Sequence, residues 1–204
     1  LALPGRADLD KEIGFPLGEG YLLVTCHPVT LADDGMRGLN ELLAALDAFP
    51  ERRILFTGVN ADPGNRALAE AIDQYVAARS GRAALRASLG SRLYLAALKH
   101  AAAVVGNSSS GLVEAPALGT PTVNIGDRQR GRLRADSVID CPEDRAAIIA
   151  AIHRASAPHF RAAVDPARNP YGVPGASRRI RDVLRDTPLG NILIKHFHDL
   201  KAVS

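Results

Sequence analysis

The stretch that decides the fold is Gly106-Asn107-Ser108-Ser109-Ser110-Gly111-Leu112-Val113-Glu114-Ala115-Pro116. An apolar run over 101–105 precedes it, and a helix-forming pattern begins at Leu112. These features predict a buried strand, a tight loop of small hydroxylated residues and then a helix. Unpaired backbone N–H groups and the positive end of a helix dipole would meet at this loop. We therefore expect an anion, most often a phosphate, to bind there.

The same alternation of strand and helix continues on both sides of this stretch. Upstream, the apolar runs 21–26, 53–58 and 83–88 are each followed by a helical pattern. Downstream, 122–125 is a fifth expected strand and 137–140 a sixth. Continuous apolar runs are typical of strands buried on both faces of a parallel sheet. The sequence therefore predicts an α/β fold with a doubly wound, Rossmann-like parallel sheet and ligands at the strand carboxyl ends.

We divide the chain into three parts. Residues 1–20 contain glycine and proline among scattered charges, and we expect a linker from an upstream domain. Residues 21–156 are the expected Rossmann-like, nucleotide-binding domain. Residues 157–204 lose the strand–helix alternation, and we expect a C-terminal helical extension with a basic helix over 176–185. Because the chain begins with leucine and its only methionine is Met36, we expect it to be part of a longer protein.

The composition is that of an ordinary globular chain. Of its 204 residues, 47% are hydrophobic and 23% charged, and the net charge of +3 is too small to indicate a nucleic-acid partner. Cys26 and Cys141 lie in apolar contexts without metal-type spacing, so we expect reduced thiols, no metal and a cytoplasmic location. No apolar stretch approaches the roughly 20 residues of a membrane helix, and we expect no membrane partner.

Ser108 and Ser109 are the candidate phosphate ligands of the serine loop. The alternative is ordinary helix capping by Ser110 or Gly111, with Glu114 supporting the first turn. Three consecutive serines between two glycines exceed what a cap requires, which favours phosphate binding. The spacing does not match a P-loop. Glu114 would accept the ribose hydroxyls of a nucleotide, with support of the cap as the alternative.

The loop after the expected fifth strand is rich in arginine. Within seven residues it carries four of them, at 128, 130, 132 and 134. A guanidinium fork matches phosphate oxygens, whereas the alternatives are a solvated basic loop or weak nucleic-acid contact. Arg128 and Arg132 are the better candidates, because nearby glycines let the backbone approach a ligand.

His27 ends the first expected strand. It would be a proton donor or a hydrogen-bond donor to a bound phosphate, although a lone histidine is more often structural. The other histidines show no metal spacing, and His196 and His198 have no assigned role. Paired carboxylates suited to acid/base chemistry are missing from the strand ends. The residues alone therefore predict nucleotide binding without a complete catalytic set.

Six motifs stand in a fixed order along the chain: His27-Pro28-Val29-Thr30, Asn60-Ala61-Asp62, Gly106 to Gly111 with Glu114, Gly119-Thr120-Pro121, Asn124 to Gln129 with Gly131-Arg132, and Asn169-Pro170-Tyr171-Gly172. In this order they resemble the UDP-N-acetylglucosamine 2-epimerase family, most closely its hydrolysing branch. The resemblance covers residues 20–185. It implies a two-domain GT-B-type fold of which this chain is the C-terminal, nucleotide-binding half.

The resemblance also implies roles for single residues. Leu89 and Tyr94 would flank the uracil, Ser108 and Ser109 would hold the diphosphate, and Glu114 would take the ribose.

On the phosphate side, the resemblance implies that Arg128, with Arg132 near it, contacts phosphate. His27 would face the junction of diphosphate and sugar, as the catalytic residue of this half.

The family reaction converts UDP-N-acetylglucosamine and water to N-acetylmannosamine and UDP, for sialic-acid-type pathways. It runs through anti elimination of UDP to a glycal and then addition of water, without a cofactor. In the family the carboxylates that move the proton at sugar C2 come from the N-terminal domain. This chain has no counterpart to them, so we expect it to be inactive alone. The implied partners are UDP or a UDP-sugar, the N-terminal domain of the same protein and, since the family's enzymes are commonly dimers, a second copy.

Two other functions fit part of this pattern. A retaining GT-B glycosyltransferase would show a basic pair and an acidic motif at the donor, which the sequence lacks. A stand-alone nucleotide-sugar binding module would need only the binding residues.

Overall fold

The computed structural model describes residues 2–28, 36–58, 65–172, 175–190 and 193–194. The expected motif residues at 29–30 and 60–62 lie outside these residues, as do His196 and His198. The chain divides into two compact units, Leu1–Gly172 and Val173–Ser204, and each is considered by itself.

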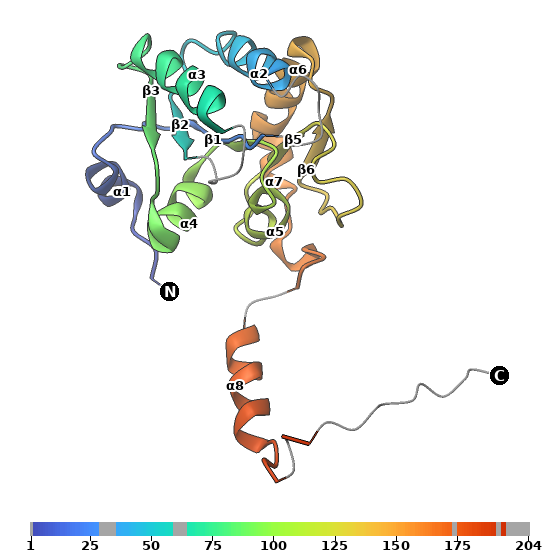
Figure 1. Ribbon diagram of the computed structural model, residues 1–204. Coiled ribbons are helices and arrows are strands. Elements are labelled where there is room, and N and C mark those ends of the chain that lie inside the picture. The colour runs from blue at the N-terminus through green and yellow to red at the C-terminus, as the bar shows by residue number, and fades with distance from the viewer. Residues whose placement is uncertain (1, 29–35, 59–64, 173–174, 191–192, 195–204) are drawn as a thin grey trace, which may run out of the picture. The chain divides into compact units, whose positions relative to one another are not determined.

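A single sheet of six parallel strands forms the centre of the first unit (Figure 1). Its order is β3-β2-β1-β4-β5-β6, and every neighbouring pair is parallel. The doubly wound parallel fold is therefore confirmed, including the sixth strand. The strands are β1 (Leu22–Thr25), β2 (Ile54–Thr57), β3 (Ala83–Arg86), β4 (Ala103–Gly106), β5 (Thr122–Ile125) and β6 (Val138–Cys141).

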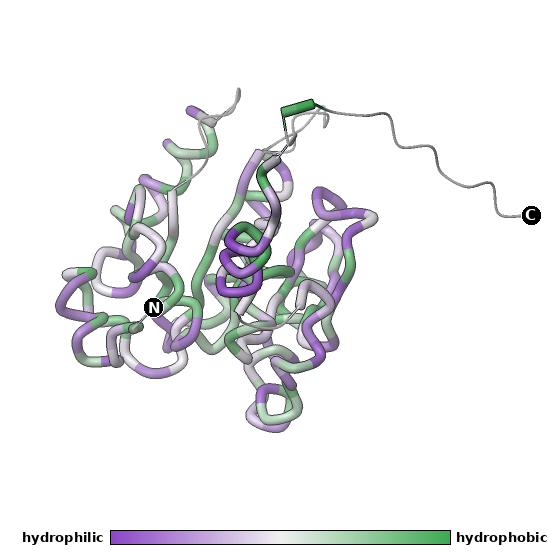
Figure 2. Tube along the Cα trace, turned by 90° about the horizontal axis from the view of Figure 1, so that it is seen from below, coloured by the Kyte–Doolittle hydropathy of each residue, from purple (hydrophilic) through white to green (hydrophobic). Residues whose placement is uncertain are grey.

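Helices cover both faces of the sheet. Alternate strand residues point to opposite faces, so Val24 joins one apolar cluster and Leu23 the other. The Val24 cluster contains residues of α2 (Arg37–Leu46), α3 (Asn65–Ala77) and α6 (Arg145–Ser156). The Leu23 cluster contains residues of α1 (Arg6–Ile13), α4 (Gly90–His100) and α5 (Ser110–Ala117). Figure 2 shows hydrophobic (green) and hydrophilic (purple) stretches alternating along the chain.

Helix α1 lies where the sequence predicted only a linker. Leu9 and Ile13 of this helix and Leu17 after it are buried in the core cluster that contains α4. The helix ends at Gly14, whose φ of 67° closes it in the left-handed conformation. Two buried apolar residues in one short helix are too few for a periodic pattern, which is why the sequence did not reveal it. A domain upstream of residue 1 stays a prediction.

Residues 157–172 pack on the first unit rather than beginning the second. This segment contains α7 (Pro158–Ala162) and a 3₁₀ turn over Pro166–Arg168. Arg161 donates to the carbonyl of Lys99 at 3.0 Å, and the amide of Asn169 donates to the carbonyl of Val113 at 3.1 Å. The boundary between the two units therefore falls at residue 172, and not at the expected 156. Long-range bonds of this kind leave no local signal in the sequence.

The second unit contains the expected basic helix, α8 (Ala176–Asp186). Its apolar residues Ile180, Val183 and Leu184 are exposed. Within the described part of the chain, no helix is long and apolar enough to cross a membrane.

Gly106, the last residue of β4, lets the ends of β1 and β4 lie close together because it has no side chain. Its φ is 139°, and a Cβ at this position would lie 2.0 Å from the carbonyl oxygen of Thr25 on β1. Any other residue would have to push β1 and β4 apart or change the backbone conformation.

We predict that Gly106→Ala lowers the free energy of unfolding by about 2–4 kcal/mol. The added methyl group would strain the backbone of residue 106 and would also clash with the carbonyl of Thr25. Urea denaturation followed by circular dichroism would measure the loss. The matched control is Gly81→Ala, where a Cβ would meet nothing within 4 Å, and which should leave stability nearly unchanged. A loss below about 1 kcal/mol for Gly106→Ala would contradict the proposed steric conflict.

Candidate functional site

The site lies where the winding of the sheet reverses. Strands β1 and β4 are neighbours, but β1 leads to α2 on one face and β4 leads to α5 on the other. The loops after such a pair separate and leave a crevice at the carboxyl edge of the sheet, where ligands of this fold class bind. His27 follows β1 and Asn107 follows β4 at this edge.

Asn107 and His27 are bound to each other through the Asn107 side chain. The backbone N–H of His27 donates to Oδ1 of Asn107 at 2.7 Å, and Nδ2 of Asn107 donates to the carbonyl of His27 at 2.8 Å. Both residues are buried, with 7% and 5% exposed surface. The backbone at His27 is therefore fixed to the serine loop by two buried bonds.

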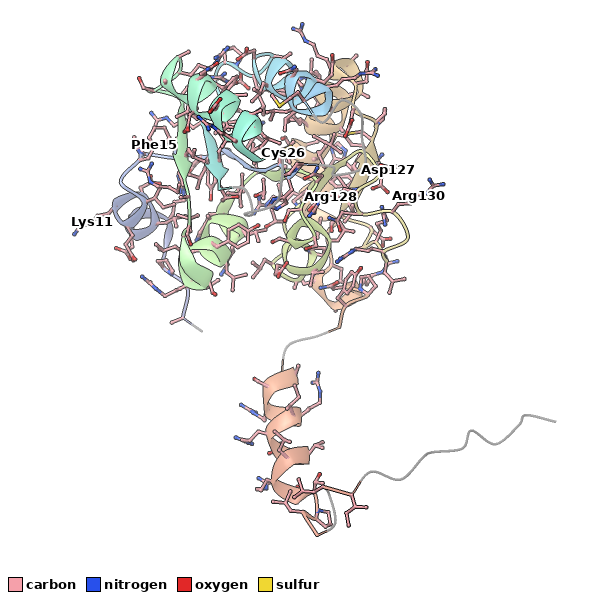
Figure 3. All side chains as sticks on the ribbon, viewed as in Figure 1. Lys11, Phe15, Cys26, Asp127, Arg128 and Arg130 are labelled. Atoms are coloured by element: carbon pink, nitrogen blue, oxygen red, sulfur yellow. The ribbon has the colours of Figure 1, made fainter. Side chains whose placement is uncertain are left out.

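The carbonyl of Asn107 binds the arginine loop. It accepts from Nη1 of Arg128 at 3.1 Å and from Nε2 of Gln129 at 2.8 Å. Gln129 is 2% exposed, whereas Arg128 is half-buried. Figure 3 shows Arg128 turned toward the body of the first unit and Arg130 extending outward. The loops after β1, β4 and β5 thus meet at one residue.

The side chains of the serine loop contribute little to the capping of helix α5. Ser109 is the cap residue of α5, and its side chain makes no capping bond. Ser108 Oγ accepts from the N–H of Ser110 at a long 3.4 Å. Among the described residues, the backbone N–H groups of Ser108 and Ser109 have no hydrogen-bond partner. Capping alone does not explain these serines, and the free N–H groups fit an anion.

Tyr94 joins α4 to the serine loop. Its hydroxyl donates to Oγ of Ser110 at 2.8 Å. Burial raises the pKa of Tyr94, while hydrogen bonds with Ser110 and Thr25 act in the opposite direction. Thr25 in turn shares a 2.6 Å bond with the hydroxyl of Thr57 at the end of β2. A chain of hydroxyls therefore connects two strand ends to the start of α5.

Glu114 lies one turn inside α5. Within the described residues, its Oε2 is buried and has no hydrogen-bond partner. A buried carboxylate oxygen is costly unless a donor reaches it, and a ligand hydroxyl would supply one. Glu114 also contributes to the raised pKa of Tyr94, which places the two groups close together.

The remaining sequence candidates have fewer contacts. Leu89 is half-buried before α4 and packs against the cluster of Leu23. Arg132 is exposed, and among the described residues its side chain has no recorded partner. Arg134 is held by Asp140 at 2.8 Å, which supports the preference for Arg128 over this arginine. Leu89 shares the Leu23 cluster with Tyr94, whereas Arg132 has no recorded contact with another candidate among the described residues.

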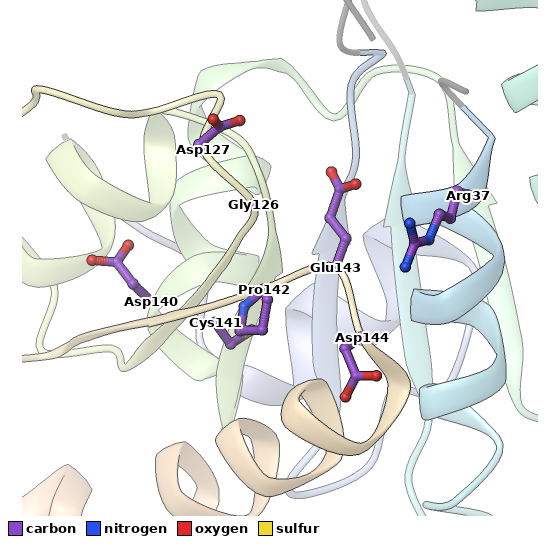
Figure 4. Close-up of a pocket in the computed structure, with 8 residues that line it drawn as sticks. All are labelled: Arg37, Gly126, Asp127, Asp140, Cys141, Pro142, Glu143 and Asp144. Atoms are coloured by element: carbon purple, nitrogen blue, oxygen red, sulfur yellow. The ribbon is translucent and has the colours of Figure 1, made fainter. Parts of the chain in front are cut away.

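Glu143 is a residue that the sequence analysis missed. It follows β6 and lines two neighbouring cavities, an open cleft of about 650 Å³ with Arg37 and Asp127, and a small cavity with Cys26 and His27. Figure 4 shows its carboxylate pointing between the β5 loop and α2. The sequence Cys141-Pro142-Glu143-Asp144 indicated only a helix start, so it gave no signal for this position. No cluster of metal-binding side chains occurs in the part of the chain that the structure describes.

Cys26, at the end of β1, is not a reactive thiol. Burial raises its pKa to about 12, the nearby Glu143 carboxylate adds to the rise, and Arg128 opposes it. The thiol is therefore neutral at physiological pH and unsuited to nucleophilic attack. The same cause raises the pKa of Cys141 to about 11.

Comparison with known proteins identifies one family. The sequence model of the family described as UDP-N-acetylglucosamine 2-epimerase matches residues 5–185. The polysialic acid biosynthesis protein P7 of Escherichia coli is 34% identical over 98% of this chain and 51% of its own length. The GDP/UDP-N,N'-diacetylbacillosamine 2-epimerase (hydrolyzing) of Campylobacter jejuni is 40% identical over 66% of this chain and 35% of its own.

Solved structures share the fold. The UDP-GlcNAc 2-epimerase of Methanocaldococcus jannaschii, determined with UDP-GlcNAc and UDP, has a TM-score of 0.63 and 16% identity. The match covers 87% of this chain and 48% of that protein. The chain thus spans about half the length of the relatives it matches most fully, in agreement with the expected half of a GT-B-type fold.

We predict that Cys26 resists alkylation in the folded protein. In a Cys141→Ser variant at pH 8, iodoacetamide should label Cys26 about a hundredfold more slowly than in urea-unfolded protein, because the raised pKa suppresses the thiolate. Mass spectrometry of timed samples would give both rates. Folded and unfolded rates within about threefold of each other would show that Cys26 is reactive.

Proposed function

Because this chain belongs to the UDP-N-acetylglucosamine 2-epimerase family, we propose that it is the UDP-binding, C-terminal half of a hydrolysing member. The substrate would be UDP-N-acetylglucosamine, and the products N-acetylmannosamine and UDP for a sialic-acid-type pathway. The name of the Campylobacter jejuni relative supports the hydrolysing reaction, but on a diacetylbacillosamine sugar nucleotide, and the name of the Escherichia coli relative supports a sialic-acid-type pathway.

One observation carries the proposal: an anion site at the reversal of the sheet. Arg128 donates to the carbonyl of the peptide bond whose N–H belongs to Ser108. This bond places the Arg128 guanidinium next to Asn107, one residue before the serine loop, whose Ser108 and Ser109 N–H groups have no partner among the described residues. Together they match the charge and the acceptor oxygens of a diphosphate.

The nucleoside would extend from the diphosphate toward α4. Glu114, with its unpartnered oxygen, would accept the ribose hydroxyls. The ring of Tyr94 would flank the uracil while its hydroxyl stays bound to Ser110. Leu89 would contact the other side of the base, and Arg132 would reach the phosphates only by moving from its exposed position.

The chemistry of this half concerns the leaving group. As the bond between sugar C1 and the diphosphate oxygen breaks, negative charge grows on UDP, and Arg128 with the serine N–H groups would stabilise it. His27 would donate a proton or a hydrogen bond to the departing oxygen. Removal of the C2 proton, which forms the glycal, would be performed by carboxylates of the N-terminal half, after which water adds to C1 and C2. The chain alone would therefore bind UDP without turning over the sugar nucleotide.

Calorimetry with UDP on the 204-residue chain tests the binding step. UDP should bind, and uridine, which lacks the phosphates, should bind at least about tenfold more weakly because the anion site is then unused. Activity should appear only when the chain is joined to the half of the Escherichia coli relative that it does not cover. Failure to bind UDP would overturn the nucleotide-binding proposal, whereas binding without activity in the joined protein would favour a stand-alone module.

Arg128→Ala should weaken UDP binding by about 1.5–3 kcal/mol, the range for a hydrogen bond to a charged group. Arg130→Ala is the matched control, since it removes an exposed arginine from the same loop. It should change the affinity by less than about 0.5 kcal/mol, as expected for a solvated surface charge. Equal losses in the two variants would mean that the loop acts through general positive charge rather than through a placed guanidinium.

A further inference from the structure

We propose that Asn107 is a positioning residue that holds the backbone of His27 in a fixed place beside the phosphate site. This inference rests on the proposed function, because it assigns Asn107 a part in presenting His27 to bound UDP. Neither the family resemblance nor the sequence pattern gave Asn107 a role of its own.

The first step is the way Asn107 continues the sheet beyond its last strand pair. The β1–β4 register ends with Thr25 opposite Gly106, and the N–H of Asn107 then donates to the carbonyl of Thr25 at 3.2 Å. Beyond that point the Asn107 side chain makes the hydrogen bonds that a neighbouring strand would otherwise make. It binds both the N–H and the carbonyl of His27. The His27 backbone is thus held as if it were still part of a ladder, although β1 has ended.

The second step is the chemistry of the side chain. A carboxamide presents one acceptor and one donor group in a plane, which matches the N–H and C=O of a single residue. Aspartate would still accept from the N–H of His27 but would place an acceptor against its carbonyl. An aliphatic side chain would leave both His27 groups without these partners in a buried position, at a cost in geometry or stability.

The third step is that the two attachments of Asn107 are separable. Its side chain binds His27, whereas its backbone carbonyl binds Arg128 and Gln129. Substitution of the side chain leaves the carbonyl in place. A variant should therefore loosen His27 while Arg128 and the serine N–H groups still hold phosphate.

These contacts differ from those of other buried polar residues in the unit. Thr120, which is fully buried, donates to the carbonyl of Leu98 at 2.9 Å and so joins the start of β5 to α4. None of its recorded contacts reaches a candidate site residue. Thr120→Val therefore removes one buried bond without touching the site, and it serves as the matched control.

The experiment compares wild type, Asn107→Ala, Asn107→Asp and Thr120→Val as 204-residue chains. UDP affinity is measured by calorimetry, and the imidazole resonances of His27 are followed by nuclear magnetic resonance with and without saturating UDP, assigned with a His27→Gln variant. Circular dichroism verifies folding. Should Asn107→Ala fail to fold, the isosteric Asn107→Asp carries the comparison.

For Asn107→Ala we expect UDP affinity within about threefold of wild type, a difference under about 0.7 kcal/mol. The shift of the His27 resonances on UDP addition should be lost. Asn107→Asp should keep part of that shift, because it still accepts from the N–H of His27. Thr120→Val should keep all of it, even where it lowers the melting temperature.

Two results would overturn the inference while the proposed function stands. A full His27 shift in Asn107→Ala, or in Asn107→Asp if only that variant folds, would show that the side chain does not position His27. A parallel loss of UDP affinity and His27 shift would show that Asn107 merely supports the whole loop. Absence of UDP binding by the wild-type chain, in contrast, would remove the proposed function itself.

Discussion

The structure depends on the close approach of two backbones at the carboxyl ends of β1 and β4. Because Gly106 has no Cβ, its Cα lies directly against the carbonyl of Thr25, and the next residue can bind across the gap. This contact brings loops from opposite faces of the sheet together at the one place where the winding reverses. The meeting of His27, Asn107 and Arg128 follows from it. A wider separation would leave the same residues present but out of reach of one another.

The charges around this meeting point are divided by position. Positive charge and N–H groups lie on the side of the serine loop, whereas Glu143 and Asp127 lie toward the cleft between the β5 loop and α2. Glu143 also lines the small cavity bordered by Cys26, His27 and Asn107, so one carboxylate lies close to the candidate anion site. The pKa of Cys26 is raised by burial and by Glu143 and lowered by Arg128, so both charges act on this thiol. The positive groups at the serine loop support the proposed role of this chain in stabilising a departing diphosphate.

The sequence predicted the features that local pattern controls. Buried strands appear as continuous apolar runs, so the parallel strands were expected, as was a basic helix over 176–185, where the structure has α8. The serine loop and Arg128 were expected because their residue types suit phosphate. What the sequence did not reveal depends on contacts between distant segments. The burial of α1 depends on two apolar residues, and the attachment of 157–172 depends on single bonds from Arg161 and Asn169. The proposed role of Asn107 depends on its bonds with His27 and Arg128, which are 80 and 21 positions away in the sequence.

The side chain of Glu143 limits the space available at the positions beside it. Its carboxylate fills a slot bounded by Gly38 of α2 and Gly126 of the β5 loop, where an added Cβ would lie 2.6 Å and 2.8 Å from its atoms. The three positions therefore lie against one another, although they come from helix α2, the loop after β5 and the segment after β6. At Gly38 an added Cβ would require the flexible end of Glu143 to move, whereas at Gly126, with a φ of 69°, a side chain would be strained whatever residue occupies position 143. The shape of the cleft therefore depends on the conformation of the Glu143 side chain as well as on the two glycines beside it.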